Sequence, residues 1–522
     1  MNRKEMAERL NRDILWDLIV IGGGASGLGV AVDAAARGYQ TLLLEQHDFA
    51  KATSSKSTKL IHGGVRYLQQ GNVNLVLEAL KERGLLMKNA PHLISNLSFI
   101  VPNYKWWDGP FYGIGLKVYD AMAGNLGLGK SQWLSKEKTV EYLPNLETEG
   151  LKGGVIYHDG QFDDARLAIS LALTAADHGA CLLNYVKVDS LLKNNGMICG
   201  VRAFDQLGSD CWDIRAKAVI NATGIFTEDI LAMDQDRVHG LMALSQGIHI
   251  VLDKHFLAGE HAIMVPHTDD GRVLFAVPWH DKVLLGTTET PVPEPELEPV
   301  PQDQEIEFLL HHAARYLRED PSRADIRSLF AGIRPLVKSD PQDTRSTAAI
   351  SREHTLMVSA SGLITITGGK WTIYRKMAED TVDKAIQVAN LDPVPCGTEH
   401  LPLHGFAEET DWSQPLHFYG SDAAAIQKLS RQNAELSQRI HPSLAYTRAE
   451  VLWAIRQEMA MTLEDVLARR TRSLFLDAAA AMEAATDVAE LMRSEWEYSL
   501  SWKQKQLDQF ENMARNFIPQ SG

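Results

Sequence analysis

The spacing of apolar and polar positions near the start of the chain predicts a strand, a tight turn and a helix. Residues 18–21 form a short apolar run rich in β-branched side chains, and this run breaks into glycines at 22–24. Residues 28–38 are mostly small, and they predict a helix that follows the glycine turn. A second strand is expected at 40–44 and ends on Glu45. This order of elements is typical of a dinucleotide-binding βαβ unit.

Three glycines and one acid of this unit have expected roles in binding a dinucleotide. Gly22 permits the turn, Gly24 lets backbone N–H groups approach a pyrophosphate, and Gly27 lets the helix pack closely on the strand. The positive end of the helix then faces the phosphates. Glu45 is placed to accept hydrogen bonds from both ribose hydroxyls. The contacts expected here are Gly22, Gly24, Ala25, Ser26, Gly27, Glu45 and Gln46.

A segment rich in hydroxyls and lysines follows at 51–59, and a Gly-Gly pair stands at 63–64. One interpretation is a solvated loop that caps a helix. The other is that hydroxyls and backbone amides hold the phosphates of the cofactor while the glycines let the main chain pass close to a flat ring. Composition alone does not separate the two. On the second interpretation the contacts include Thr53, Ser54, Ser55 and Gly63.

Helical and strand-like patterns alternate along the rest of the chain. Apolar strands at 217–221 and 363–367 both run into glycine turns, and we expect them to return to the first sheet, which places Gly224 beside the cofactor. Helical periodicity is found at 72–88, 167–179, 304–317 and 372–388. Period-two alternation predicts antiparallel strands at 180–192, 200–204, 211–214, 248–252, 262–265, 273–277 and 283–286. The last four of these strands are expected to form the wall of a substrate pocket.

The predicted fold class is therefore α/β with α+β character. A Rossmann-like dinucleotide-binding domain carries an inserted antiparallel-sheet substrate domain and is followed by a C-terminal helical domain with few candidate catalytic groups. The proline-rich stretch 291–301 is expected to be an exposed excursion. The expected ranges are 1–100, 150–240 and 330–395 for the discontinuous nucleotide domain, 101–149 and 241–329 for the substrate or cap domain, and 396–522 for the helical domain.

Composition narrows the function classes. The chain has 522 residues and a formal net charge of −15, which argues against general nucleic-acid binding and requires a locally basic pocket for any anionic substrate. The four cysteines have no metal or redox spacing, so free thiols in a reducing compartment are expected and no metal site is predicted. The N-terminus lacks the apolar core of a signal peptide, and no apolar run approaches the roughly 20 residues of a membrane span. The chain is expected to be soluble or to lie on a membrane surface.

Two other stretches each allow two interpretations. Residues 104–116 contain Trp106 and Trp107 beside a lysine and a glycine-broken apolar run, which is compatible with a core cluster or with a bilayer interface. In the tail, the arginines of 468–472 face either acidic phospholipid or the protein's own carboxylates, and the second is the more ordinary.

Two cations stand next to glycine turns in segments that converge on the first sheet. Arg334 precedes a proline, and Lys370 follows a Gly-Gly pair. A single cation of this kind is usually solvated, but the pair indicates an anion pocket. Arginine suits bidentate phosphate contact, and lysine acts as a point charge.

Seven motifs, taken together and in order, resemble the FAD-dependent glycerol-3-phosphate dehydrogenases of the D-amino-acid-oxidase-like flavoprotein group. The match covers nearly the whole chain. The chain departs from the pattern at Trp371, where a smaller aliphatic residue is common, and in the diverged tail, and it has no calcium-loop pattern like that of the mitochondrial members. The motifs lie at 22–27, 52–55, 59–67, 162–166, 221–224, 332–336 and 368–372.

The resemblance implies FAD as the cofactor and the oxidation of sn-glycerol 3-phosphate to dihydroxyacetone phosphate, with hydride transfer from C2 to the flavin N5. Only one dinucleotide fingerprint is present, so the electrons are expected to enter from the organic substrate. We expect a quinone to accept them, at the inner face of the cytoplasmic membrane, with peripheral attachment. The alternatives are a soluble oxidase that makes hydrogen peroxide, a D-amino-acid or glycine oxidase, and a non-catalytic flavin-binding regulatory protein. The sequence does not fix the oligomeric state, and a homodimer stays open.

The resemblance also assigns site residues. His62 is the first choice for the base that takes the hydroxyl proton, and His249 is the second. Arg334, Arg66 and Lys370 are the expected ligands of the phosphate and the alkoxide, with Tyr67 lining the pocket; Lys370 is alternatively placed to stabilise the reduced flavin. The remaining flavin contacts that the resemblance implies are Lys59, Leu60, His62, Val188, Ala222, Thr223, Gly369, Lys370, Trp371 and Thr372.

Overall fold

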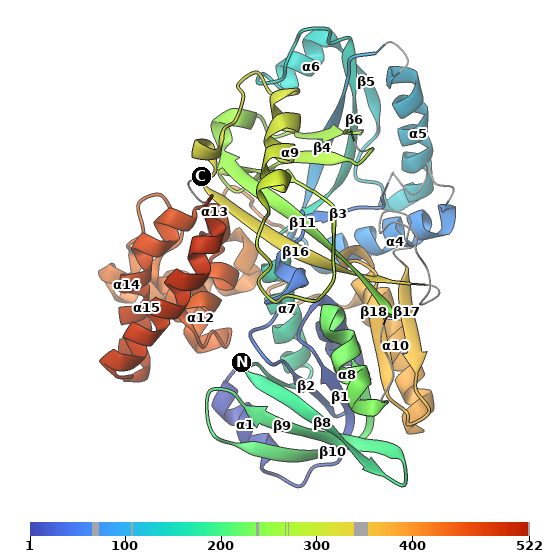
Figure 1. Cartoon of the computed structure of the whole chain (residues 1–522), viewed down its shortest axis with the longest axis vertical. Coiled ribbons are helices and arrows are strands. Elements are labelled where there is room, and N and C mark those ends of the chain that lie inside the picture. The colour runs from blue at the N-terminus through green and yellow to red at the C-terminus, as the bar shows by residue number, and fades with distance from the viewer. Residues whose placement is uncertain are drawn as a thin grey trace.

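The computed structural model describes residues 1–64, 72–105, 108–235, 240–266, 268–269, 271–338 and 353–519. Two large sheets form the body of the molecule, one below the other in Figure 1, and the C-terminal helices pack at one side. This arrangement confirms the predicted fold class.

The first sheet is built around parallel strands. Its order is β17-β18-β10-β1-β2-β7, in which β18, β10, β1, β2 and β7 are parallel and β17 is antiparallel. The helix α2 (Ala25–Ala36) packs between α7 (Asp164–Asp177) and α10 (Tyr374–Ala389). The strands are β1 (Trp16–Ile21), β2 (Thr41–Leu44), β7 (Cys181–Leu183), β8 (Val186–Asn194), β9 (Met197–Asp205), β10 (Cys211–Asn221), β17 (His354–Val358) and β18 (Ile364–Gly368).

Strand β10 has two kinds of neighbour. Residues 211–215 pair antiparallel with β9, and residues 216–221 pair parallel with β1. The predicted return of this segment to the first sheet is confirmed. The strand expected at 180–192 is divided, because β7 pairs with β2 whereas β8 pairs with β9, and Tyr185 between them has a left-handed backbone with φ of 57°.

The second sheet is mostly antiparallel. Its order is β15-β11-β14-β13-β12-β4-β6-β3, with β16 paired to β11 and β5 paired to β6. The strands β3, β4, β6 and β16 lie in or across the ranges 1–100, 150–240 and 330–395 expected for the nucleotide domain, so the sheet does not follow those boundaries. Its strands are β3 (Leu60–Ile61), β4 (Ile94–Asn103), β5 (Gln132–Ser135), β6 (Gly153–Phe162), β11 (Met242–Asp253), β12 (Ala262–Val265), β13 (Leu274–Trp279), β14 (Lys282–Gly286), β15 (Thr290–Val292) and β16 (Ser328–Val337).

Helices cover the outside of this second sheet and form most of the tail. In the tail, α14 buries an alanine-rich face, which includes Ala481 and Ala485, and packs against α15, where Phe510 is buried. Among the described residues, no helix has both the length and the apolar character needed to cross a bilayer. The other α-helices are α1 (Arg3–Leu10), α4 (Val73–Asn89), α5 (Asp108–Ala123), α6 (Lys136–Tyr142), α8 (Thr227–Asp234), α9 (Asp303–Ala314), α11 (Ala423–Gln432), α12 (Arg448–Gln457), α13 (Ser473–Leu476), α14 (Ala478–Trp496) and α15 (Leu500–Ala514).

The tail arginines face the protein's own carboxylates, which confirms the more ordinary of the two interpretations. Arg469, Arg470 and Arg472 are each at most 2% exposed, and they form ion pairs with Asp48, Glu464, Asp465, Asp163 and Asp164. These pairs join the tail to the first sheet and its helices.

A histidine joins the same two parts of the molecule. The Nδ1 atom of His404 lies 2.6 Å from Asp177 at the end of α7, and its Nε2 atom lies 2.9 Å from Asp422 before α11. The hydrogen bond with Asp422, and then that with Asp177, raise the pKa of His404 to about 9, although burial opposes the shift.

We expect this histidine to make the tail contact weaker at alkaline pH. Because the pKa of His404 is higher in the folded state than its unperturbed value, its contribution to stability is present below about pH 6.5 and is lost as the pH rises through 9. The melting temperature of His404→Gln should therefore fall less between pH 6.5 and pH 9 than that of the parent protein. Parallel melting curves for the two proteins would contradict this assignment.

Candidate functional site

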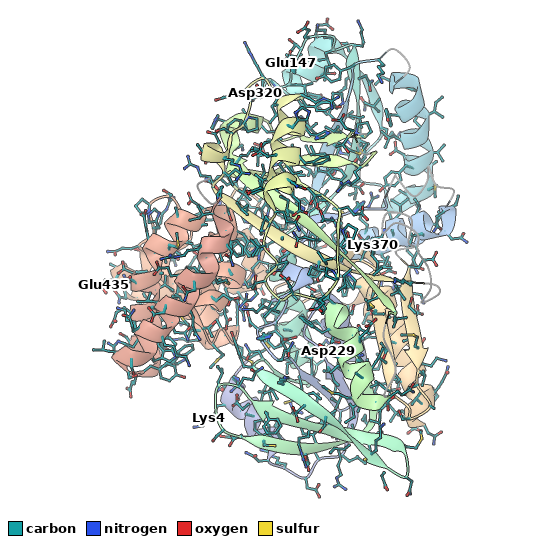
Figure 2. All side chains as sticks on the ribbon, in the orientation of Figure 1. Lys4, Glu147, Asp229, Asp320, Lys370 and Glu435 are labelled. Carbon is teal, nitrogen blue, oxygen red and sulfur yellow. The ribbon has the colours of Figure 1, made fainter. Side chains whose placement is uncertain are left out.

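A cavity of about 770 Å³ lies between the two sheets. The carboxyl ends of β1, β2, β10 and β18 meet at one side of it, and β11 and β16 of the second sheet form the other. Open α/β sheets bind their ligands at such carboxyl ends. Lys370, labelled in Figure 2, lies where the two sheets meet, and Asp229 of α8 lines the cavity below it.

The glycine turn brings α2 into direct contact with the end of β1. Gly22 has φ of 109°, and a Cβ atom added at Gly27 would lie 1.9 Å from the carbonyl oxygen of Gly22. The N-cap Gly24 has no side chain, and the Ala25 N–H donates to Ser54 Oγ at 3.0 Å. The N-terminal, positive end of α2 therefore borders the cavity, where a phosphate would be stabilised.

Glu45 stands at the end of β2 with both carboxylate oxygens held. Its Oε2 accepts from the Gly23 N–H at 2.6 Å and its Oε1 from the His47 N–H at 2.7 Å. Burial raises the pKa of Glu45, and these two hydrogen bonds oppose the rise. The carboxylate lines the cavity in the place expected for a ribose contact.

The segment that follows lies along the cavity. Thr53 Oγ1 donates to the Ile333 carbonyl at 2.7 Å, and the Trp371 indole N–H donates to the Ser54 carbonyl at 2.9 Å. Lys59 is turned the other way: it is fully buried, and its ammonium lies 2.6 Å from Asp164 Oδ2, away from the cavity wall.

His249 stands at the end of the cavity formed by the second sheet. Its ring stacks on Phe330 with centroids 5.0 Å apart, and its Nε2 atom lies 2.9 Å from Thr58 Oγ1. Burial, and then the charges of Lys59 and Arg334, lower the pKa of His249 well below its ordinary value. The imidazole is therefore neutral at neutral pH and is in the state that accepts a proton. A Cβ atom at Gly286, opposite His249 in the strand pair, would lie 2.1 Å from the ring.

Arg334 lies on β16 beside this histidine. Its guanidinium donates to Thr287 Oγ1 at 2.9 Å, to the Thr288 carbonyl at 3.1 Å and to the Gln246 carbonyl at 3.3 Å. A Cβ atom at Gly247 would lie 2.3 Å from it. These contacts hold the planar cation at the cavity wall, where it suits a bidentate oxyanion such as phosphate.

Most of the sequence-predicted site residues lie on this one cavity. Gly27, Ser55, Lys59 and Gly63 do not line it. Arg66, Tyr67, Trp106 and Trp107 lie outside the described residues. Those that line it are Gly22, Gly24, Ala25, Ser26, Glu45, Gln46, Thr53, Ser54, Leu60, His62, Val188, Ala222, Thr223, Gly224, His249, Arg334, Gly369, Lys370, Trp371 and Thr372.

The structure adds wall residues that sequence reasoning did not select. Thr58, Lys51 and Lys56 stand in the hydroxyl- and lysine-rich segment, but nothing in its composition singles them out, and His47 lies just before that segment. The proline-rich stretch 291–301 is not simply an exposed excursion. Its Leu297 lines the cavity, and the Lys56 ammonium binds the Leu297 carbonyl at 3.0 Å and Glu298 Oε2 at 2.6 Å.

The polar groups that line the cavity fit a dinucleotide. At one end are a ribose-type carboxylate and the positive end of a helix, and at the other are a guanidinium and a neutral imidazole. FAD would be held by the residues around Gly24, Glu45, Ser54 and Gly369. The substrate end would lie against His249 and Arg334.

Comparison with protein families agrees with this site. Residues 17–375 match the family model described as FAD dependent oxidoreductase. Residues 362–506 match the model described as the C-terminal domain of alpha-glycerophosphate oxidase.

Known proteins resemble nearly the whole chain. The probable mitochondrial glycerol-3-phosphate dehydrogenase of Caenorhabditis elegans is 41% identical over 548 residues, which cover 99% of this chain and 75% of the relative. The mitochondrial glycerol-3-phosphate dehydrogenase of Mesocricetus auratus is 41% identical over 531 residues, or 94% of this chain and 72% of the relative. Among solved structures, the glycerol-3-phosphate dehydrogenase from Bacillus halodurans complexed with FAD is 30% identical, with a TM-score of 0.81 and coverage of 100% of this chain and 99% of that one.

We expect Gly27→Ala to weaken flavin binding. The new Cβ atom would force α2 away from the Gly22 carbonyl, and overpacking of this kind costs about 1–3 kcal/mol. Because the helix end is part of the phosphate site, FAD affinity should fall about tenfold or more, as measured by flavin retention on gel filtration. Gly115→Ala on α5, where a Cβ atom meets nothing within 4 Å, is the matched control. Equal retention by the two variants would show that the contact between Gly27 and Gly22 is not needed.

Proposed function

The chain belongs to the family of FAD-dependent glycerol-3-phosphate dehydrogenases, and on this basis we propose that it oxidises sn-glycerol 3-phosphate to dihydroxyacetone phosphate and delivers the electrons to a quinone. The observation that supports the substrate most directly is that a guanidinium, Arg334, and a neutral imidazole, His249, border the same end of a dinucleotide-type cavity.

Arg334 and Lys370 are the proposed ligands of the substrate phosphate. Both line the cavity, and the three hydrogen bonds of Arg334 to the second sheet fix the direction of its guanidinium. In a chain with a net charge of −15, such cations make the pocket locally attractive to a phosphate. Arg66 and Tyr67 remain proposed ligands from the sequence and lie outside the described residues.

The base is proposed to be His249 or His62. Both line the cavity. Burial keeps the His249 imidazole unprotonated, and the contact of its Nε2 atom with Thr58 Oγ1 orients the ring. The main chain of His62 is held at 3.3 Å by Thr372 Oγ1, which accepts from the His62 N–H and donates to the His62 carbonyl. Bound FAD supplies the two-electron acceptor, a capacity that none of these side chains has. The protein then binds the phosphate, takes the proton of the C2 hydroxyl and keeps water from the reacting atoms.

We expect glycerol 3-phosphate to bleach the visible flavin absorbance of the purified protein under anaerobic conditions. Arg334→Ala should weaken substrate-dependent reduction by roughly 2–5 kcal/mol, because it leaves a desolvated phosphate without its cation. Arg327→Ala, just before β16, where the side chain is 47% exposed and pairs with Asp253, is the matched control.

The other outcomes identify the alternatives. Bleaching by glycine or a D-amino acid and not by glycerol 3-phosphate would favour an amino-acid oxidase. Absence of bleaching by any of these substrates would favour a flavin-binding regulatory protein.

A separate observation supports the proposed peripheral attachment to a membrane, where the quinone would be reduced. Ile114 and Val118 of α5 are 63% and 46% exposed, and Trp133 of β5 is 49% exposed. Trp133 lies over this helix, since a Cβ atom at Gly113 would be 2.2 Å from its Nε1 atom and the Lys117 ammonium is 3.8 Å from its ring centroid. Apolar side chains around a tryptophan and a lysine suit the interface of a bilayer with anionic lipids. We call Ile114, Val118 and Trp133 the α5 face. Trp106 and Trp107, for which a bilayer interface is one of the two interpretations, directly precede α5 in the sequence.

The proposed location is the inner face of the cytoplasmic membrane, with peripheral attachment. All four cysteines are free thiols, which suits a reducing compartment. The proposed function is compatible with a homodimer and does not depend on one.

We expect the double variant Ile114→Glu, Val118→Glu to lose binding to anionic phospholipid vesicles and to lose quinone reduction on them. Its activity with a soluble dye acceptor should stay at the parent level, because the α5 face does not line the cavity. Leu500→Glu at the start of α15, where the side chain is 73% exposed, is the control. Loss of both activities would make this face part of the core, and rapid peroxide formation in air without quinone would favour the soluble oxidase.

A further inference from the structure

The cavity wall formed by residues 45–59, which we call the dinucleotide loop, is held from behind by the C-terminal helices. The loop supplies eleven of its fifteen residues to the cavity, among them Glu45, His47, Lys51 and Ser54. Among the described residues, none beyond Met377 lines the cavity, so the C-terminal helices contribute no side chain to it directly. They contact the back of the loop.

Asp48 is the centre of this contact. It is fully buried, and its carboxylate accepts hydrogen bonds from Arg470 at 2.6 and 2.9 Å, from Arg469 at 2.5 Å and from Asn184 at 3.2 Å. Burial by itself would raise the pKa of Asp48, but the charges of Arg470 and Arg469 hold it below its ordinary value. The aspartate therefore stays ionised and fixes the loop between His47 and Phe49.

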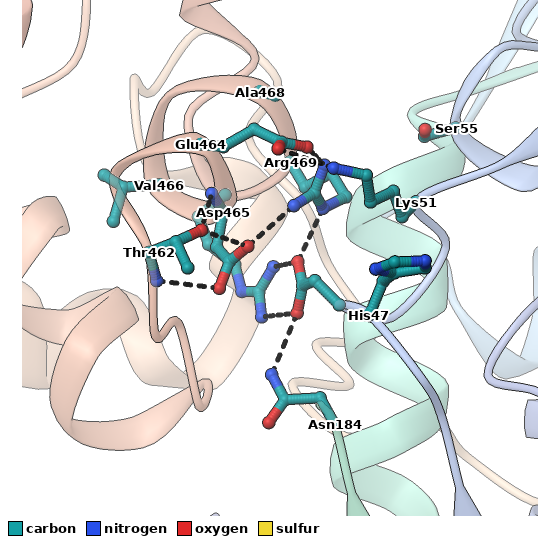
Figure 3. A network of polar contacts seen from close by, with 12 residues as sticks. His47, Lys51, Ser55, Asn184, Thr462, Glu464, Asp465, Val466, Ala468 and Arg469 are labelled. Carbon is teal, nitrogen blue, oxygen red and sulfur yellow. Dashed lines mark hydrogen bonds and ion pairs between the residues drawn. The ribbon is translucent and has the colours of Figure 1, made fainter. Parts of the chain in front are cut away.

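A second chain of contacts reaches the cavity wall at Lys51. The Lys51 ammonium lies 2.6 Å from Glu464 Oε2, and Glu464 Oε1 accepts from Arg469 at 2.6 Å (Figure 3). Arg469 also donates to Asp465 at 2.7 Å, and Asp465 accepts from the Tyr185 hydroxyl at 2.6 Å. The Tyr185 N–H in turn donates to the His47 carbonyl at 2.8 Å. Arg469 therefore contacts the loop directly at Asp48, and indirectly through Glu464 and through Asp465.

A third contact fixes the end of the loop. Arg472 donates to the Ser55 carbonyl at 2.9 Å and to Asp164 Oδ1 at 3.2 Å. The Lys59 ammonium donates to the same Ser55 carbonyl at 2.9 Å and to Asp164 Oδ2 at 2.6 Å. Ser54, whose hydroxyl borders the end of α2, and Thr58, which holds His249, flank this anchored part.

We propose that Arg469, Arg470 and Arg472 are positioning residues for FAD, which act through the dinucleotide loop and give the C-terminal helices a role in cofactor binding. The inference rests on the proposed function for the identity of the cofactor. Buried ion pairs are a poor way to hold two parts of a protein together, because desolvation offsets most of their attraction, and apolar packing of the same volume is often as stable. Their directional hydrogen bonds instead specify one conformation of the loop.

The test compares two arginines at the same interface. Arg470→Met removes both hydrogen bonds to Asp48, together with two to the Glu458 carbonyl at 3.2 and 2.8 Å. Arg166→Met removes the buried bidentate pair with Glu458, in which both bonds are 2.8 Å. Glu458 Oε2 lies 4.0 Å from Arg470 Nε, but within the described part of the chain no hydrogen bond or ion pair joins Arg166 or the Glu458 side chain to the loop. Both variants should melt at lower temperature than the parent, because each leaves a buried carboxylate with fewer partners.

The distinguishing measurement is the rate at which the flavin-loaded protein releases FAD, followed by the rise in flavin fluorescence. We expect release to be about tenfold faster in Arg470→Met and within about twofold of the parent in Arg166→Met. Release at the parent rate in both, or acceleration in both in proportion to the loss of melting temperature, would overturn the proposal.

Glu464→Gln gives a milder test if Arg470→Met does not fold. The Glu464 side chain is 17% exposed and does not line the cavity. The substitution removes the negative charge that pairs with both Lys51 and Arg469. Faster FAD release is again expected, and an unchanged rate would contradict the inference. A parent protein without bound flavin would contradict the proposed function as well, whereas a flavin-loaded parent with unaffected variants contradicts only the role of the arginines.

Discussion

The close approach of α2 to the end of β1 is the constraint on which the cavity depends. The helix can meet the strand there only because Gly27 has no side chain beside the Gly22 carbonyl. This contact fixes the direction of the helix and therefore the place where its positive end stabilises phosphate. The other walls are arranged around that point: Glu45 ends the neighbouring strand, and Gly224 and Gly369 follow the ends of β10 and β18.

At the opposite end of the cavity, glycines again leave room for close contacts, here for the side chains of the proposed substrate site. Gly247 and Gly286 leave the space that the Arg334 guanidinium and the His249 ring occupy. A permanent cation and a histidine kept neutral by burial then stand on adjacent strands of one rigid sheet. Such a pair separates the task of holding an anion, which needs a permanent charge, from the task of accepting a proton, which needs a neutral imidazole.

Local patterns predicted the parts of the site that are close in sequence. The first strand, the glycine turn, α2 and Glu45 follow from about 30 consecutive residues, and their chemistry is visible in the order of residue types. The pairing of Thr58 with His249 was not visible, because 191 positions separate them and a threonine in a hydroxyl-rich run has no distinguishing neighbour. Lys59 shows the converse limit: a lysine in a phosphate-binding motif has the right charge, but Asp164 draws its ammonium to the other side of the chain.

The topology of the first sheet also has a consequence for the order of biosynthesis. Its parallel strands come from residues near 16, 41, 181, 216 and 364, so every parallel pairing except that of β1 with β2 closes a long stretch of chain. Contacts of such high sequence separation form late. A nascent polypeptide that has emerged only as far as β10 holds the glycine turn but lacks β18, and the arginines that brace the loop emerge about 100 residues later still. The ribosome must therefore nearly finish the chain before the flavin has a complete binding site, which leaves a long interval in which chaperones can protect the open strands.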